Sequence, residues 1–332
     1  MASRVPAVAA LLCLFSYVKN LDIDKSDGGY KDLLISINKD VPYNETIIEN
    51  VKSLLRSSSH FLHRATNGLV YFKHVTINFP HTWPKRSSAR RLSSSLFEKS
   101  DVRIDLPAES QEQERPFTKQ WKLCGKPGEY IKVTPKFLAD LNDSTTKTFG
   151  NPAYVFVHEW AHYRYGVFDE HGWRDDEKYP LTYCEEDPVT GVTLVKLNAC
   201  SSKISFNPTL ASGDSCPLNE TTCIFPKECI IRTTTERINP VESSIMFMPY
   251  VPNVSHFCDS TNGVRHHDPH APSEQNAICQ GRSTWEVISE NEDFKSLARA
   301  NMSRPSKVTF EETQHRDDLP RGLSWFLTSH AG

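Results

Sequence analysis

The feature that most restricts how this chain can fold is the run His158-Glu159-Trp160-Ala161-His162. Two histidines four positions apart project from the same face of a helix, so both imidazoles can reach one metal ion. Helix-end signals flank the run, because Asn151 is a preferred N-cap, Pro152 suits the first helical position and Gly166 suits the position after the last turn. The sequence therefore predicts a buried helix over 152–165 that carries a zinc site. The alternative is a chance occurrence in which both histidines are ordinary buried polar groups.

The same residues predict a reaction. Neutral imidazoles hold Zn²⁺ while leaving a coordination position for water, whose pKa the ion lowers to about 7. Glu159 is rotated by about 100° from His158 around the helix, near enough to take a proton from that water as it attacks a peptide carbonyl. We therefore expect His158 and His162 to bind zinc and Glu159 to be the catalytic general base of a metalloprotease that hydrolyses peptide bonds.

A catalytic zinc needs a third protein ligand. Six residues after His162, where the metzincin pattern places that ligand, stands Phe168, which cannot coordinate a metal. Asp169 follows immediately, and a turn at Gly166 can bring the chain back toward the metal. We choose Asp169 on its geometry and its carboxylate chemistry. The chemistry of Glu170 and His171 leaves both open as alternatives.

The N-terminus predicts where the protein goes. Arg4 precedes an apolar run over 7–18, about a dozen residues, which suits a signal-peptide core and falls short of the roughly 20 needed to span a bilayer. We expect a signal peptide over 1–21 and a secreted, extracellular protein without a transmembrane segment; a buried N-terminal helix is the alternative. A net charge of −3 and a pI near 6.5 argue against nucleic acid as a partner.

Cysteines and glycosylation motifs agree with secretion. Of nine cysteines, Cys13 lies in the apolar run, and an even set of eight remains, which predicts disulfides whose pairing the sequence leaves open. These eight are Cys124, Cys184, Cys200, Cys216, Cys223, Cys229, Cys258 and Cys279. Asn-x-Ser/Thr motifs predict a glycoprotein and stand at Asn44, Asn142, Asn219, Asn253 and Asn301.

The pattern along the chain predicts an α/β fold. Helical spacing of apolar residues favours a helix over 46–65, and β-branched or alternating stretches favour strands over 32–37, 69–79 and 102–106. Because seven of the eight cysteines follow residue 180, we expect a catalytic domain over 22–180 and a disulfide-rich segment over 181–294. Residues 295–332 lack a convincing period and predict a flexible tail. We interpret the histidine-rich stretch 266–270 as a surface loop.

The motif also resembles a known family. Residues 158–170 (HEWAHYRYGVFDE) fit HExxHxxxGxxDE, the metalloprotease signature of the calcium-activated chloride channel regulator family. The resemblance covers roughly residues 29 to 294. Further similar stretches are 71–75 (YFKHV), 134–137 (TPKF), 244–247 (SIMF) and 283–288 (STWEVI).

This resemblance implies a secreted, zinc-dependent protein with a zincin-like catalytic domain, a mixed sheet with an HExxH active-site helix, followed by a cysteine-rich segment. It assigns zinc binding to His158, His162 and Asp169 and catalysis to Glu159. Met246 resembles the methionine of a Met-turn, the apolar floor below the zinc; an ordinary core methionine is an equal alternative by composition.

The sequence departs from longer family members, which continue into a von Willebrand factor A domain whose D-x-S-x-S motif this chain lacks. The chain resembles a truncated member, in which self-cleavage at the family's usual place is not expected. Two functions follow from these observations. The first is a secreted zinc endopeptidase that acts on a protein or peptide substrate. The alternative is a catalytically dispensable secreted regulator that modulates chloride conductance by protein binding, with a chloride channel at the cell surface as its partner.

Overall fold

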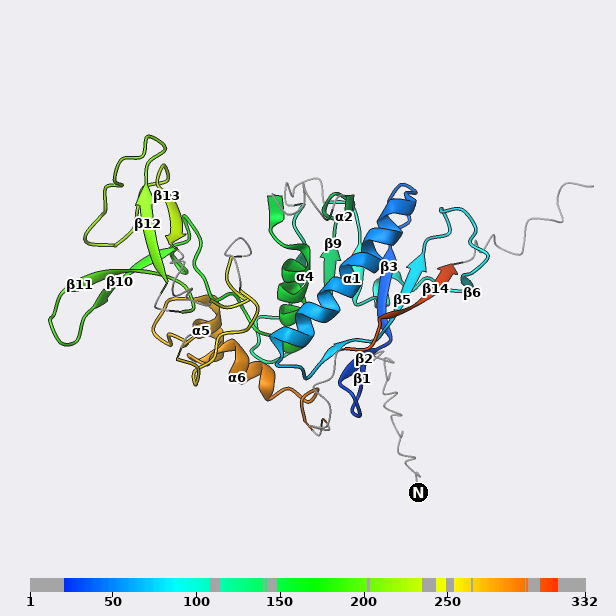
Figure 1. Ribbon diagram of the computed structural model, residues 1–332. Coiled ribbons are helices and arrows are strands. Elements are labelled where there is room, and N and C mark those ends of the chain that lie inside the picture. Colours follow the sequence, from blue (N-terminus) through cyan, green and yellow to red (C-terminus); the bar gives the residue numbers. More distant parts are fainter. Residues whose placement is uncertain are drawn as a thin grey trace, which may run out of the picture.

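A computed structural model describes residues 21–107, 114–139, 141, 148–201, 204–234, 243–248, 254–263, 265–295, 297 and 305–315 (Figure 1). The predicted signal peptide lies outside these residues except for Leu21. The sequons at Asn142, Asn253 and Asn301 also lie outside them.

A seven-stranded mixed sheet forms the centre of the fold, as the α/β pattern predicts. Its strands are parallel except β8 (Phe117–Lys119), which runs antiparallel to β9 (Tyr130–Val133) at one edge. The inner strand β3 (LLISI) is buried along its whole length, as expected for a parallel strand covered on both faces. In spatial order the strands are β6 (Arg90–Leu92), β14 (Thr309–His315), β5 (His74–Phe79), β3 (Leu33–Ile37), β7 (Val102–Ile104), β9 (Tyr130–Val133) and β8 (Phe117–Lys119).

Two helices, α1 (Glu45–Ala65) and α4 (Pro152–Trp160), lie side by side against this sheet (Figure 1). The side chain of Asn44 caps α1 by accepting from the backbone N–H of Thr46, and the predicted apolar stripe of α1 is buried. Phe61 of α1 meets Tyr154 of α4 with ring centroids 5.9 Å apart. The short helix α2 (Pro135–Ala139) packs near the same helix α1.

The remaining elements are short. Figure 1 shows two β-hairpins extending away from the central sheet, and both belong to the cysteine-rich segment. The hairpins are β10 (Thr182–Glu186) with β11 (Thr193–Leu197), and β12 (Ser205–Thr209) with β13 (Ile230–Thr234). A small sheet contains β1 (Asp22–Asp24), β2 (Gly29–Lys31) and β4 (Tyr71–Phe72); the other short helices are η1 (Phe97–Lys99), α5 (Glu274–Cys279) and α6 (Thr284–Ser289).

Disulfides join all eight of the predicted cysteines, which confirms the expectation of disulfide bonding. One of the bonds connects Cys124, before the predicted boundary at residue 180, to Cys279 in the cysteine-rich segment. The two regions are therefore covalently tied as well as packed together. The pairs are Cys124–Cys279, Cys184–Cys223, Cys200–Cys258 and Cys216–Cys229.

The prediction of a flexible tail after residue 295 is wrong for 309–315, which forms strand β14 inside the central sheet. This strand runs parallel to β5 on one side and to β6 on the other. Its inward residues are polar, so no apolar alternation marks it in the sequence. Thr313 donates to Asn78 Oδ1, and Gln314 donates to backbone carbonyls that include Trp83. Hydrogen bonds that link residues more than 200 positions apart therefore stabilise this strand.

Candidate metal centre

The segment that carries both histidines begins as predicted and ends differently. Asn151 caps α4 by accepting from the N–H groups of Ala153 and Tyr154. The single helix expected over 152–165 is instead α4 followed by a π-helical turn, η2 (Ala161–Tyr165). Contacts from distant segments hold this wide turn, because Tyr163 donates to Asp101 (2.5 Å) and Arg164 pairs with Asp293 (2.5 Å). Such contacts leave no periodic pattern in the sequence, so the sequence did not predict the π-helical turn.

The two histidines point their Nε2 atoms at each other, 3.1 Å apart, from buried positions. Backbone carbonyls orient both rings: His158 Nδ1 lies 2.9 Å from the oxygen of Ile245, and His162 Nδ1 lies 2.7 Å from that of Val167. A carbonyl only accepts hydrogen bonds, so each Nδ1 carries a proton and each Nε2 is the atom left to bind either a metal ion or a second proton. This is the arrangement that metal-binding histidines show.

Asp169 completes a group of three donors after the chain turns at Gly166, whose φ is 63°. Its Oδ1 lies 3.2 Å from His158 Nε2 and 3.4 Å from His162 Nε2. Zn–N bonds of about 2.0–2.1 Å place tetrahedral donor atoms roughly 3.3 Å apart, close to these separations. Among the residues that the structure describes, Oδ1 is buried without a hydrogen-bond partner. The donor set therefore fits Zn²⁺.

Electrostatics in this group favour an anionic aspartate beside a cation. Burial alone raises the pKa of Asp169, but His171, His158 and His162 outweigh it and hold that pKa well below its usual range. Burial likewise lowers the pKa of His162, whereas Asp169 and Glu159 raise it, with a net rise to about 9. A proton on His162 thus occupies the place that a metal ion would take.

The two alternatives for a third ligand lie in other positions. The Glu170 carboxylate accepts from Thr284, 3.0 Å from its Oγ1, and lies outside the group of three donors. His171 Nε2 lies 3.7 Å from Asp169 Oδ2, which is the carboxylate oxygen that does not face His158 and His162. Burial lowers the pKa of His171, and the neighbouring Asp169 carboxylate offsets part of this effect. The structure thus brings Asp169 together with both histidines, and neither alternative joins them.

Glu159 is buried on the side of the helix that faces the edge strand β8. The hydroxyl of Thr118, in β8, lies 2.9 Å from Glu159 Oε2 and 2.8 Å from the Glu159 carbonyl oxygen. The carboxylate is near enough to contribute to the raised pKa of His162. Glu159 is therefore held beside the histidines with one oxygen engaged by Thr118.

The loop 244–247 lies against the histidine-bearing helix and contains Met246, which is fully buried. Tyr154 of α4 donates to the carbonyls of Ser244 and Phe247, both at 3.1 Å. The next carbonyl, that of Ile245, orients His158. This loop therefore connects the cysteine-rich segment directly to the candidate metal site.

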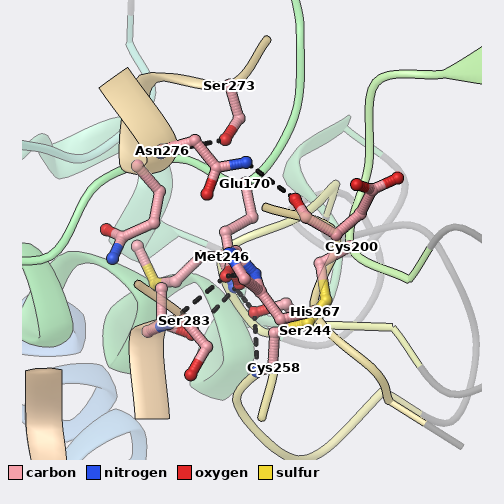
Figure 2. A network of polar contacts seen from close by, with 12 residues as sticks. Glu170, Cys200, Ser244, Met246, Cys258, His267, Ser273, Asn276 and Ser283 are labelled. Carbon is pink, nitrogen blue, oxygen red and sulfur yellow. Dashed lines mark hydrogen bonds and ion pairs between the residues drawn. A yellow bond between two sulfur atoms is a disulfide. The ribbon is translucent and has the colours of Figure 1, made fainter. Parts of the chain in front are cut away.

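A second group of metal-type side chains contains Glu170, Cys200, Cys258 and His267 (Figure 2). The two cysteines form a disulfide, so their sulfurs do not act as thiolate ligands. His267 is 4% exposed, and the interpretation of 266–270 as a surface loop is wrong for this residue. Burial lowers the pKa of His267, but the Glu170 carboxylate, 3.3 Å from its Nδ1, raises it above the ordinary value. This group is a polar network joined to the candidate metal site through Glu170, which directly follows Asp169.

Sequence reasoning missed several residues that position the site. Thr118, Gln275 and Thr284 stand in unremarkable local contexts, and only the folded chain brings them to Glu159 and to the segment around Asp169. No spacing rule connects them to residues 158–170, since they lie about 40 to 120 positions away along the chain.

Fold and site together define a disulfide-bonded α/β protein in which two buried histidines and a partly buried aspartate form one group. The family model described as calcium-activated chloride channel, N terminal, matches residues 23–301, and the chain belongs to this family. Human calcium-activated chloride channel regulator 2 is 35% identical over 303 residues, 90% of this chain and 30% of that protein. Human regulator 4 is 34% identical over 295 residues, 86% of this chain and 30% of that protein.

Mouse regulator 2 is 34% identical over 299 residues, 88% of this chain and 29% of that protein. The chain thus spans about a third or less of the length of these relatives. No solved structure is significantly similar to it. In the part of the chain that the structure describes, none of the helices combines the length and the apolar character needed to cross a bilayer.

Proposed function

We propose that this chain is a secreted zinc metalloprotease whose ligands are His158, His162 and Asp169. The observation that carries the proposal is the buried group of three donor atoms 3.1–3.4 Å apart, in which Asp169 Oδ1 accepts no hydrogen bond from the described residues. Zn²⁺ at this group would supply Lewis acidity and lower the pKa of a water molecule that attacks the peptide carbonyl.

Glu159 is the residue that moves the proton in this proposal. Thr118 engages Oε2, which leaves Oε1 to take a proton from the attacking water and to deliver it to the departing amine. Such a positioned acid–base group contributes about 10²–10⁴-fold to a rate.

The arrangement of the site supports a zincin-like catalytic domain. The helix with both histidines packs over a mixed sheet, and the buried Met246 lies in a loop whose carbonyls contact Tyr154 and His158. We assign to Met246 the role of the Met-turn methionine. Four disulfides favour an oxidising, extracellular compartment, and exposed sequons at Asn44 and Asn219 suit glycosylation there.

A second candidate function comes from the names of the relatives, which describe regulators of calcium-activated chloride channels. On this reading the chain modulates chloride conductance by binding protein partners, including a channel at the cell surface, and hydrolysis is dispensable. The two functions make opposite predictions for Glu159, because a binding surface does not require a buried general base.

The deciding experiment compares purified secreted wild-type protein with Glu159→Gln. Metal content is measured by mass spectrometry, cleavage with a peptide library, and chloride conductance on cells. We expect equal zinc in both proteins and a cleavage rate about 10²–10⁴-fold lower in the variant. Equal cleavage by both proteins refutes the protease. Conductance effects that survive Glu159→Gln unchanged support the regulator.

A further inference from the structure

Glu170 follows Asp169 directly, yet its side chain points into the cysteine-rich segment (Figure 2). Its carboxylate has no solvent exposure and is met by the N–H of Thr284 (3.3 Å), the Thr284 hydroxyl (3.0 Å) and His267 Nδ1 (3.3 Å). A buried carboxylate is costly unless such partners satisfy it. The position of Glu170 is therefore fixed by Thr284 and His267.

The backbone on both sides of Asp169 is held by the same part of the chain. Gln275 acts twice, accepting from Phe168 N–H through its side chain and donating to the Asp169 carbonyl through its own N–H. The N–H of Glu170 donates to the carbonyl of Met246, and the N–H of Cys200 donates to the carbonyl of Glu170. The distances are 2.8 Å for Phe168 N to Gln275 Oε1, 3.1 Å for Gln275 N to Asp169 O, 2.8 Å for Glu170 N to Met246 O and 3.1 Å for Cys200 N to Glu170 O.

We propose that Glu170 is a positioning residue for the metal ligand Asp169, anchored by Thr284 and His267; this rests on the metal site of the proposed function. The Asp169 side chain is short, so its carboxylate reaches both histidines only while its backbone stays in place. Among the described residues of 168–171, Glu170 supplies the charged side chain that ties this backbone to α6. Groups that orient metal ligands in this way typically contribute about 10–100-fold to metal affinity.

Two disulfides stabilise the anchoring segments. Cys258 accepts from the N–H of Trp285, directly after Thr284, and is bonded to Cys200, whose own N–H donates to Glu170. Cys279 ends the helix that contains Gln275. The cysteine-rich segment is on this account an integral part of the metal centre, since it sets where the third ligand lies.

The test measures zinc affinity in the full chain by competition with a chromophoric chelator. Glu170→Gln keeps the size of the side chain and removes its charge, and Thr284→Val removes one hydroxyl donor with little change of shape. Thr284→Ser restores that donor. The matched control is Glu286→Gln, because Glu286 caps the same helix and its hydrogen bonds go to Ser283 and Ser260.

We expect the zinc Kd to rise about 10–100-fold in Glu170→Gln and by a smaller factor in Thr284→Val, with Thr284→Ser near wild type. Glu286→Gln lowers the melting temperature and leaves the Kd unchanged. Visible absorption of the Co²⁺-substituted protein supplies a second readout, since displacement of the Asp169 oxygen changes the ligand field. Glu170→Gln at saturating Co²⁺ should therefore differ from wild type.

Wild-type zinc affinity and an unaltered Co²⁺ spectrum in both Glu170→Gln and Thr284→Val overturn the positioning role while leaving the protease intact. An equal loss of affinity in Glu286→Gln also overturns it, because the effect is then general destabilisation. A wild-type protein that binds no zinc removes the proposed function and this inference together. Zinc binding that depends on Glu170 without peptide cleavage keeps the positioning role and removes the protease.

Discussion

The backbone carbonyl oxygen of Lys126 lies 2.3 Å from the place that a Cβ atom would occupy on Gly166. The two chain segments are also hydrogen-bonded here, since Gly125 N–H donates to the Gly166 carbonyl. Gly166 therefore meets two requirements at once, a left-handed φ of 63° and space for another backbone. The turn that leads from His162 to Asp169 depends on both.

We expect Gly166→Ala to destabilise the protein and to weaken zinc binding. The left-handed backbone costs about 1–2 kcal/mol for a residue with a Cβ, and the contact with Lys126 adds to it. Gly191→Ala is the matched control, because Gly191 has a similar φ of 66° and its Cβ would meet only Glu186 at 3.8 Å. Denaturant unfolding measures both variants. Equal losses of stability would contradict a role for the close approach.

Replacing Asp169 tests the third ligand. Asp169→Ala removes the oxygen that lies 3.2 and 3.4 Å from the two histidine nitrogens, and we expect zinc affinity to fall by at least about 100-fold. His171→Ala, at the other carboxylate oxygen, should cost much less. Equilibrium dialysis with metal analysis measures both. A larger loss in His171→Ala than in Asp169→Ala would show that the assignment is wrong.

Zinc binding should be linked to pH through His162. The pKa of this ring in the metal-free fold is about 9, mainly because Asp169 outweighs the effect of burial, and a metal ion requires the deprotonated ring. At pH 7 binding therefore releases about one proton, and affinity rises up to tenfold per pH unit until roughly pH 9. Calorimetry in two buffers of different ionisation enthalpy counts the protons. A count near zero at pH 7 would contradict the linkage.

The same shift affects the stability of the metal-free protein. The folded-state pKa of His162 lies above its unfolded value of about 6.5, so the stabilisation is complete below pH 6.5 and is lost as pH rises through about 9. We expect the melting temperature in chelator to fall over that interval. Asp169→Asn removes the charge that raises the pKa of His162, and its melting temperature should depend less on pH over the same range.

Strand β14 supplies a prediction about the fold. Gln314 is buried and donates to the carbonyls of Pro80, Trp83 and Pro84. Gln314→Leu leaves these carbonyls without their donor, and we expect a loss of about 3 kcal/mol in the free energy of unfolding. Glu311→Gln, in an exposed pair with Arg90 on the same strand, should cost less than about 1 kcal/mol. Comparable losses in chemical denaturation would argue against the buried network.

Local patterns in the sequence determined the elements whose signals lie within a few residues. The apolar stripe of 46–65 predicted α1, and the cap at Asn151 with Pro152 predicted the start of α4. The spacing of His158 and His162 and the glycine before Asp169 predicted which side chains approach one another. Eight cysteines outside the apolar N-terminal run predicted disulfides, without their partners.

Tertiary structure alone decided the features that depend on contacts between distant segments. The π-helical turn after Trp160 is held by Asp101 and Asp293, and β14 by hydrogen bonds of Gln314, so neither has a local signal. Contacts with distant segments also decide that the side chains of Asp169 and Glu170 point in opposite directions. Adjacent carboxylates are chemically alike in a sequence, and only the folded chain places that of Asp169 beside two histidines and that of Glu170 against Thr284.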